Sequence, residues 1–227
     1  MRKILVTLLI SSPILIFGWA WQSPNTPPAL PASELDTSVR QFLESRRGTW
    51  RDMNVSASDG QILYNIIVER KYKSGLEIGT STGHSGTWIG WALAKNGGKL
   101  ITIDIDRDRH EEAVANFKAA GLARYIDARL GDAHALVPAL AGPFDFVFSD
   151  ADKDWYKNYL EAVLPKLAVG GCFVSHNISE RGYESGYSRI FLQYARSLPF
   201  LETTIVGSGN SGMSVTYKKA EGPLKKP

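Results

Sequence analysis

The sequence predicts an α/β protein built on a seven-stranded, mostly parallel sheet with an antiparallel last strand and helices on both faces. Two observations lead to this fold class. Short apolar segments alternate five times with helical segments, which is the pattern of parallel strands joined by crossover helices. The last two strand-like segments, Leu201–Val206 and Met213–Tyr217, have no helix between them, so they pair antiparallel or at least without a crossover.

Hydrophobic periodicity and turn-forming residues define the elements in order. Helices are expected first at Asp36–Arg47 and Ser58–Tyr72, and a third helix passes through residues 88–92 and breaks at the Asn96-Gly97-Gly98 sequence. The five strands expected before the final pair are Gly75–Ile78, Lys99–Ile103, Ile126–Leu130, Phe144–Ser149 and Cys172–Ser175. The later helices are expected at Arg107–Ala120, Ala133–Leu140, Trp155–Leu167 and Tyr187–Leu198.

The composition describes a single globular domain. The chain has 227 residues, of which 44% are hydrophobic, and this is enough for one large core. The formal net charge of +3 is too small to indicate nucleic-acid binding. Cys172 is the only cysteine, so the chain forms no internal disulfide, and its apolar neighbours predict an inert core thiol. Residues 218–227 are expected to form a basic, disordered tail.

Residues 1–20 have the pattern of a signal peptide. Arg2 and Lys3 precede an apolar run at Ile4–Phe17, and Gly18-Trp-Ala20 offers small residues for cleavage. The run is shorter than the roughly 20 residues of a membrane span. An uncleaved N-terminal anchor is the alternative, and it would be the only contact with a membrane. We therefore expect an exported protein, periplasmic or secreted, or one anchored by its N-terminus. Proline-rich residues 21–33 are expected to form a linker before a domain at residues 34–217.

A glycine-rich turn follows the first predicted strand, and an acid ends the second. Gly79, Gly83 and Gly86 lie in that turn, and Asp104 follows 25 residues after Gly79. Glycines let the backbone pass close to a ligand, and an acid at this place binds ribose hydroxyls. The spacing differs from the G-x-G-x-x-G of dinucleotide-binding proteins, and the sequence has no P-loop. S-adenosylmethionine, a nucleoside without phosphate, is therefore the candidate cofactor.

Polar residues also follow the fourth and fifth predicted strands. Asp150 directly follows an apolar run, so we expect it to be partly buried and to need a cation. His176 and Asn177 follow the adjacent strand. Carboxylate, imidazole and amide groups at one edge of the sheet suit a divalent metal with open positions, so Asp150, His176 and Asn177 are its predicted ligands. A solvated turn in which an aspartate caps the next helix is the alternative.

Together these motifs resemble the class I S-adenosylmethionine-dependent O-methyltransferases of the catechol and caffeoyl-CoA type. The resemblance covers about residues 34–217, and the segment Phe144–Tyr156 is nearly the family signature. It implies a Rossmann-like class I methyltransferase fold and methyl transfer to a hydroxyl of a small, aromatic, catechol-like acceptor, with help from a metal. The family is often dimeric, so a homodimer is also implied.

The resemblance also implies which residues form the site. Those expected to bind the cofactor are Met53, Val55, Glu77, Gly79, Ser85, Asp104, Ile105, Asp132, Ala133 and His134. Asp150 is implied as a metal ligand and Lys153 as the general base, although Lys153 paired at the surface with Asp152 or Asp154 is the alternative. His176 departs from the family, which has an aspartate there. Imidazole favours manganese, iron or zinc over magnesium, and the loss of metal dependence stays open.

Two other functions stay open from the sequence. One is an NAD-dependent oxidoreductase on a similar sheet, and the other is an exported, non-catalytic ligand-binding relic of the fold. The polar loop Ile178–Gly186 is expected to be a substrate lid, in which Arg181 or Tyr183 selects the acceptor. Trp155 is a candidate wall for an aromatic acceptor. His84 either faces the ligand or has its hydrogen bonds satisfied at the start of a helix.

Overall fold

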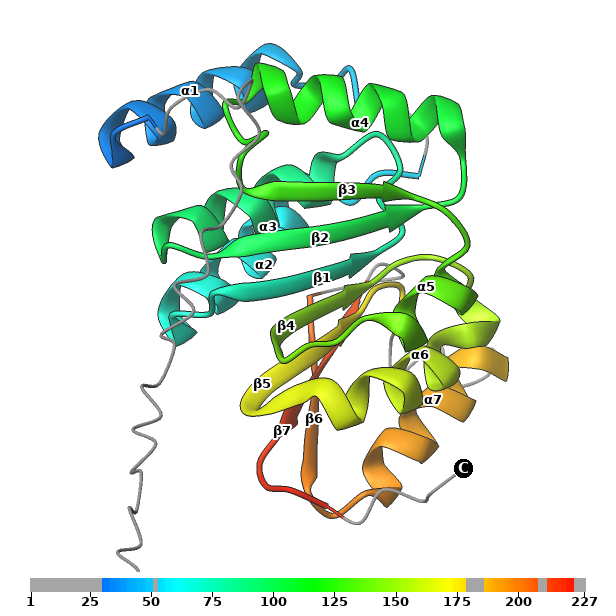
Figure 1. The fold of residues 1–227 in the computed structure, drawn as a ribbon. Helices are drawn as coiled ribbons and strands as arrows, with labels where there is room; N and C mark the ends of the chain where they lie inside the picture. Colours follow the sequence, from blue (N-terminus) through cyan, green and yellow to red (C-terminus); the bar gives the residue numbers. More distant parts are fainter. Residues whose placement is uncertain (1–29, 51–52, 179–185, 208–211, 223–227) are drawn as a thin grey trace, which may run out of the picture.

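The computed structural model describes residues 30–50, 53–178, 186–207 and 212–222. Its centre is a seven-stranded sheet in the order β3-β2-β1-β4-β5-β7-β6 (Figure 1). The strands are β1 (Ser74–Ile78), β2 (Lys99–Asp104), β3 (Ile126–Leu130), β4 (Phe144–Ser149), β5 (Leu167–Ser175), β6 (Leu201–Val206) and β7 (Met213–Lys218). β1 to β5 pair in parallel, whereas β7 lies antiparallel between β5 and β6. The predicted fold class is confirmed.

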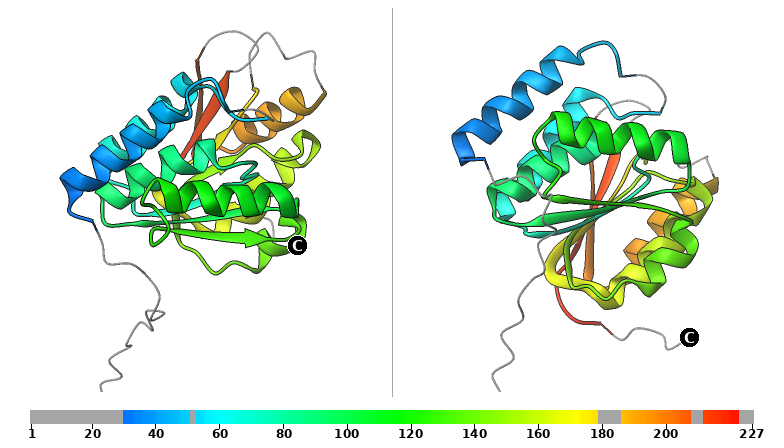
Figure 2. Two further views of the ribbon diagram at one scale, coloured as in Figure 1. Left: turned by 90° about the horizontal axis from the view of Figure 1, so that it is seen from above. Right: turned by 45° about the horizontal axis from the view of Figure 1, so that its top comes forward.

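The helices lie in two layers, one on each face of the sheet (Figure 2). The first layer holds α1 (Ala32–Ser45), α2 (Ala57–Arg70), α3 (His84–Lys95) and α4 (Arg107–Ala119). The second holds α5 (Ala133–Ala139), α6 (Tyr156–Val163) and α7 (Gly186–Ser197), with 3-10 turns η1 (Lys153–Trp155) and η2 (Leu164–Lys166) at the two ends of α6.

Alternation along the central strands builds a core on each face. Phe146 and Phe148 of β4 pack with α2 and α3, whereas Val147, which lies between them, packs with α6 and α7. Successive side chains of a strand point to opposite faces, so a continuous apolar strand supplies both cores. Cys172 of β5 lies in the α2 and α3 core, as predicted, and burial raises its pKa to about 12, which disfavours the reactive thiolate.

The helix predicted at Trp155–Leu167 is shorter in the structure, and β5 is longer than predicted. α6 ends at Val163, because Pro165 has no N–H with which to continue the helical hydrogen bonds. β5 begins at Leu167 and runs through Gly170-Gly171, the pair expected to end the helix. The pairing between β4 and β5 shifts register there, so the two glycines belong to an irregular strand.

The ends of the domain also differ from the prediction. α1 begins at Ala32, inside the segment predicted as linker. The predicted basic tail is wrong at its first residue, because Lys218 ends β7 and is 2% exposed. Its Nζ donates to the carbonyls of Leu164 at 3.2 Å and Leu167 at 2.9 Å. Residues 1–20 lie outside the described residues, and within these no helix is long and apolar enough to cross a membrane.

Candidate active site

The carboxyl ends of β1 to β4 surround a cavity of about 520 Å³. Ligands of open α/β folds bind at this edge of the sheet. The cavity brings together most of the predicted cofactor residues and one predicted metal ligand, which are Met53, Gly79, Ser85, Asp104, Ile105, Asp132, Ala133, His134 and Asp150. Val55, Glu77, Lys153, His176 and Asn177 are not part of its lining.

Gly79 and Gly83 shape the turn between β1 and α3. Their φ angles are 96° and 92°, in a region that residues with a Cβ rarely adopt. A Cβ at Gly79 would lie 2.9 Å from backbone atoms of Asp150, and one at Gly83 would lie 2.8 Å from the ring of Phe117. Glycine at position 79 therefore lets the chain leave β1 beside the end of β4, and glycine at position 83 lets the turn pack closely against Phe117.

Two backbone amides hold the carboxylate of Asp104 at the end of β2. Its Oδ2 accepts a hydrogen bond from the amide of Ser81 at 2.6 Å, and its Oδ1 accepts one from the amide of Asp106 at 2.9 Å. A carboxylate has about four acceptor positions. Asp104 therefore keeps acceptor capacity for a ligand in the cavity that it lines.

Glu77 lies beneath the glycine turn and supports it. Its side chain is fully buried, and Oε2 accepts a hydrogen bond from Oγ1 of Thr102 at 2.6 Å. Burial raises the pKa of Glu77 to about 8, and hydrogen bonds from Thr102 and Ser85 partly offset this rise. Ser85 lines the cavity and Glu77 does not. Glu77 therefore contacts the site through its hydrogen bond with Ser85 and not through the cavity itself.

His134 closes the cavity at the ends of β3 and β4. Its ring stacks on Trp155 with 3.6 Å between the ring centroids and 14° between the planes. Nε2 of His134 lies 3.0 Å from Oδ2 of Asp152, whose Oδ1 accepts a hydrogen bond from Tyr159 at 2.7 Å. The stack therefore occupies one face of Trp155, the residue expected to form a wall for the acceptor.

Val55 and His84 lie outside the lining of this cavity and contact each other. Nδ1 of His84 donates to the carbonyl of Val55 at 2.8 Å, and Nε2 accepts from Nε1 of Trp88 at 3.1 Å. Burial lowers the pKa of His84, which keeps the ring neutral, as this pattern of one donor and one acceptor requires. Of the two interpretations of His84, the structure supports the satisfied histidine at the start of a helix.

Asp150, at the end of β4, contacts both Lys153 and His176. Its Oδ1 contacts Nζ of Lys153, which also donates to the hydroxyl of Tyr156 at 2.9 Å. Lys153 therefore does not pair with Asp152 or Asp154, and the surface-pair alternative is wrong. On its other side, Oδ2 of Asp150 lies 3.1 Å from Nδ1 of His176. Asp150 therefore connects the cavity to a lysine and to an imidazole.

His176 is buried between two carboxylates. Nδ1 faces Asp150, and Nε2 lies 3.4 Å from Oδ2 of Asp59, in the first turn of α2. Burial alone would lower the pKa of His176, but Asp150 and Asp59 outweigh it and raise the pKa above its ordinary value. The imidazole therefore joins α2 to the end of β4.

The predicted metal ligands are only partly brought together. Asp150 and His176 converge, and Asn177 follows in the left-handed region with φ 55°. Asp59 faces the opposite nitrogen of the imidazole, so it does not join them. No cluster of three or more His, Cys, Asp or Glu within the described ranges has the geometry to hold a metal. The predicted lid residues Arg181 and Tyr183 lie outside the described residues.

Sequence reasoning missed three residues of this region. Asp59 contacts His176, Tyr156 contacts Lys153, and Arg109 lines the cavity. Only Asp59 had a usable signal, because Ser56-x-x-Asp59 is a capping pattern that marks the start of a helix. Its partner lies 117 residues away, and nothing in a single sequence indicates that distance.

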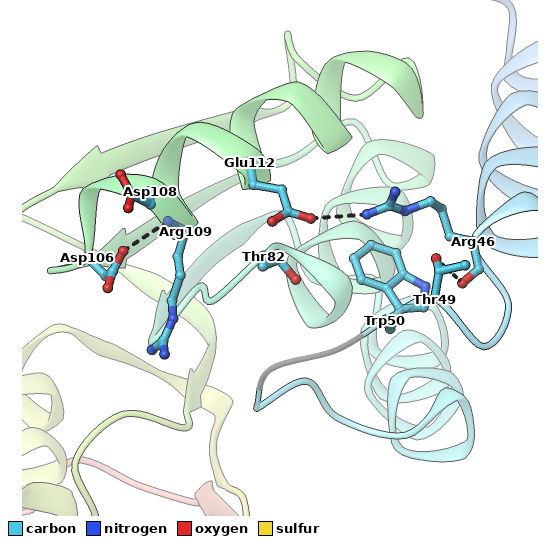
Figure 3. Close-up of a pocket in the computed structure, with 8 residues that line it drawn as sticks. All are labelled: Arg46, Thr49, Trp50, Thr82, Asp106, Asp108, Arg109 and Glu112. Atoms are coloured by element: carbon cyan, nitrogen blue, oxygen red, sulfur yellow. Dashed lines mark hydrogen bonds and ion pairs between the residues drawn. The ribbon is translucent and has the colours of Figure 1, made fainter.

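A second, polar cavity of about 510 Å³ lies between the α1–α2 connection and α4 (Figure 3). Arg46 and Glu112 form an ion pair of 3.1 Å across it, which ties the end of α1 to α4. Trp50 and Thr82 also line it, and Arg109 lines both cavities. The lining holds two arginines, Arg46 and Arg109, and three carboxylates, those of Asp106, Asp108 and Glu112, so the cavity is not a basic site for an anion.

Comparison with known proteins adds to this geometry. The family model described as O-methyltransferase matches residues 32–185. Caffeoyl-CoA O-methyltransferase 2 of Eucalyptus globulus is 38% identical over 141 residues, which cover 59% of this chain and 57% of that protein. Catechol O-methyltransferase of Niastella koreensis is 36% identical over 134 residues, covering 57% of this chain and 60% of that protein. The chain therefore spans less than two thirds of the length of these curated relatives.

A solved structure agrees with the fold. The O-methyltransferase TomG from Streptomyces achromogenes, involved in tomaymycin synthesis and solved in complex with SAM, matches with a TM-score of 0.71 and 25% identity. The match covers 81% of this chain and 90% of that chain. Since the family model covers well over half of the sequence, this protein belongs to the O-methyltransferase family.

Proposed function

We propose that the protein transfers the methyl group of S-adenosylmethionine to a hydroxyl of a small, aromatic, catechol-like acceptor. The observation that carries this proposal is Asp150, which lines the cofactor-sized cavity and contacts both Lys153 and His176. A site for the methyl donor and a group that can accept a proton are therefore adjacent. The relatives named for caffeoyl-CoA and catechol support the acceptor class, and family membership argues against an NAD-dependent oxidoreductase.

The cofactor is proposed to bind along the ends of β1, β2 and β3. Asp104 accepts hydrogen bonds from the ribose hydroxyls, and the backbone at Gly79 with Ser85 meets the methionine part. Asp132, Ala133 and His134 line the adenine end. Most of the rate gain then comes from alignment of the acceptor oxygen, the methyl carbon and the sulfur, because the reaction requires an in-line displacement.

Lys153 is proposed to take the proton of the attacking hydroxyl. Its Nζ is held between Asp150 and the hydroxyl of Tyr156, at the border of the cavity. Two fixed partners restrict a long side chain that is otherwise free to rotate, so the nitrogen stays where the acceptor must approach. The proton moves from the acceptor oxygen to Nζ as the bond from that oxygen to the methyl carbon forms and the bond from the methyl carbon to sulfur breaks.

The chemistry of Asp150 and His176 fits a divalent metal. Oδ2 and Nδ1 lie 3.1 Å apart, a separation at which two atoms can bind one ion. The buried Nδ1 makes no hydrogen bond of good geometry within the described part of the chain, and Asn177 is next in sequence. A mixed nitrogen and oxygen set suits manganese, iron or zinc better than magnesium. When bound, such an ion would make the acceptor hydroxyl more acidic.

The test is methyl transfer by the full chain to a catechol, followed by mass spectrometry, for the natural sequence and for Lys153→Met. The variant should lose about 10²- to 10⁴-fold in kcat, because it lacks the proposed base. Its affinity for S-adenosylmethionine, measured by calorimetry, should stay within about twofold, because Lys153 does not line the cofactor cavity. Binding of S-adenosylmethionine without transfer to any catechol would favour the non-catalytic alternative.

The oligomeric state is proposed from the family resemblance alone. A homodimer is expected, and sedimentation of the purified protein measures it directly. A monomer over the full concentration range would contradict that expectation and would leave the proposed chemistry unaffected.

A further inference from the structure

Asp59 is a buried carboxylate that the proposed reaction does not use. It is 5% exposed and lies in the first turn of α2, with Oδ2 3.4 Å from Nε2 of His176. A buried carboxylate is costly unless hydrogen bonds or charges compensate for the loss of water. His176 and Ser56 are the contacts that provide this compensation.

Asp59 is fixed by the start of its own helix. Ser56 is the N-cap of α2, and its Oγ accepts a hydrogen bond from the amide of Asp59 at 3.1 Å. The same Oγ donates to Oδ2 of Asp59 at 2.7 Å. These two bonds join the side chain to the helix end, so the carboxylate reaches His176 from a rigid element.

We propose that Asp59 is a positioning residue that sets the tautomer of His176 and thereby prepares Nδ1 to bind a divalent metal together with Asp150. This inference rests on the metal assistance proposed above. A neutral imidazole has one N–H, and the nitrogen that carries it is set by the hydrogen bond made there. With Asp59 accepting from Nε2, the lone pair remains on Nδ1, which faces Asp150.

Without Asp59, no carboxylate would accept a hydrogen bond from Nε2 of His176, and the N–H would no longer be held on that nitrogen. Asp150 would then attract the N–H to Nδ1, and that nitrogen could not bind a metal. Carboxylates that hold the distal nitrogen of a metal-binding histidine raise affinity by about 10- to 100-fold in other proteins. Asp59 fills that place because this chain has an imidazole at position 176, so its role depends on His176.

The experiment measures Co²⁺ and Zn²⁺ binding by the full chain in a double-mutant cycle. Asp59→Asn keeps the side-chain volume and replaces an acceptor-only carboxylate with an amide that can also donate to Nε2, so one tautomer is no longer imposed. Co²⁺ affinity should then fall by roughly 10- to 100-fold with a changed visible absorption spectrum. In the His176→Asp background, which has no tautomer to set, the same substitution should change affinity by no more than about twofold. Glu69→Gln, an exposed charge removal on the same helix, should leave affinity unchanged.

Two results would overturn the inference. One is equal loss of affinity in both backgrounds, which would mean that Asp59 acts only as a nearby negative charge. The other is a natural sequence that binds neither Co²⁺ nor Zn²⁺, which would make His176 a cationic bridge between Asp59 and Asp150. Calorimetry with S-adenosylmethionine on the same samples shows whether Asp59→Asn is folded. Methyl transfer itself is tested separately with Lys153→Met, so failure of one idea does not imply failure of the other.

Discussion

Asp150 connects the parts of the proposed reaction at the scale of single residues. It lines the cofactor cavity, and its two oxygens face Lys153 and His176. The surrounding charges explain why a carboxylate can be partly buried at the end of an apolar strand, since each oxygen has a cationic or polar partner. The residues around Asp150 have distinct tasks, and substitutions should separate them.

Asp104→Ala should weaken the binding of S-adenosylmethionine by about 1.5–3 kcal/mol, the range for hydrogen bonds to a charged group. The carboxylate lines the cavity, and its hydrogen bonds with two backbone amides leave acceptor capacity for the ribose hydroxyls, which alanine removes. Calorimetric titration of the variant measures it. An unchanged dissociation constant would remove Asp104 from the proposed ribose site.

Glu77→Gln should reduce the loss of stability on going from mildly acidic to alkaline pH. Burial raises the pKa of Glu77 to about 8 from an ordinary value of 4.5. Between these values the unfolded chain loses the proton and the folded protein keeps it, so stability falls as pH rises. Glutamine does not titrate, so the variant should show a smaller decrease in Tm between about pH 5 and about pH 8.5. Parallel Tm curves for the two proteins would contradict the buried, protonated state of Glu77.

The residues of the site that could be predicted from the sequence are those whose conformation depends on their neighbours along the chain. The glycines after β1 and the acid after β2 lie in turns whose conformation depends on neighbouring residues, and the structure places Gly79 and Asp104 at one cavity. Glu77 and Val55 were assigned to the cofactor by resemblance, and the structure leaves both outside the lining of the cavity. Asp59 and Tyr156 could not be found, because their roles depend on side chains brought together only by folding.

The junction between α6 and β5 shows the same contrast at the scale of elements. Pro165 indicates from the sequence that the helix ends early, and α6 does end at Val163. The contribution of Lys218 was not visible, because a lysine pair near the end of a chain normally indicates a solvated segment. Antiparallel insertion of β7 between β5 and β6 buries that lysine against carbonyls of the junction.

Lys218→Met should destabilise the fold by about 1–3 kcal/mol, because two carbonyls lose a charged donor. The neighbouring Lys219, which pairs with Glu202 at the surface, provides the control. Lys219→Met should cost no more than about 1 kcal/mol, as exposed ion pairs do. Urea denaturation of the two variants compares them directly. Equal midpoints would show that the buried ammonium contributes no more than an exposed one.

At the scale of the molecule, the site joins both helical layers across the end of the sheet. Asp59 comes from α2 on one face, whereas Lys153 and Tyr156 come from η1 and α6 on the other (Figure 1). Asp150 and His176 follow β4 and β5 between them. A change in the packing of either helical layer should therefore move the side chains of the proposed metal ligands or of the proposed base. Under the proposal for Asp59, the hydrogen bonds of Ser56 at the start of α2 therefore contribute to a site on the neighbouring strands.

The remaining prediction concerns residues 1–20, which we propose to be an export signal cleaved near Ala20. The charged start, the apolar run and the small residues at Gly18 and Ala20 support it. Cleavage there would leave α1 intact, and α1 is part of the domain, because Asp36 accepts hydrogen bonds from Trp91 at 2.6 Å and Lys95 at 2.6 Å. Mass spectrometry of the protein from its native host should find a mature chain that begins just after Ala20. A membrane-bound chain that retains residues 1–20 would support the anchor instead, and a soluble cytosolic chain that retains them would contradict both.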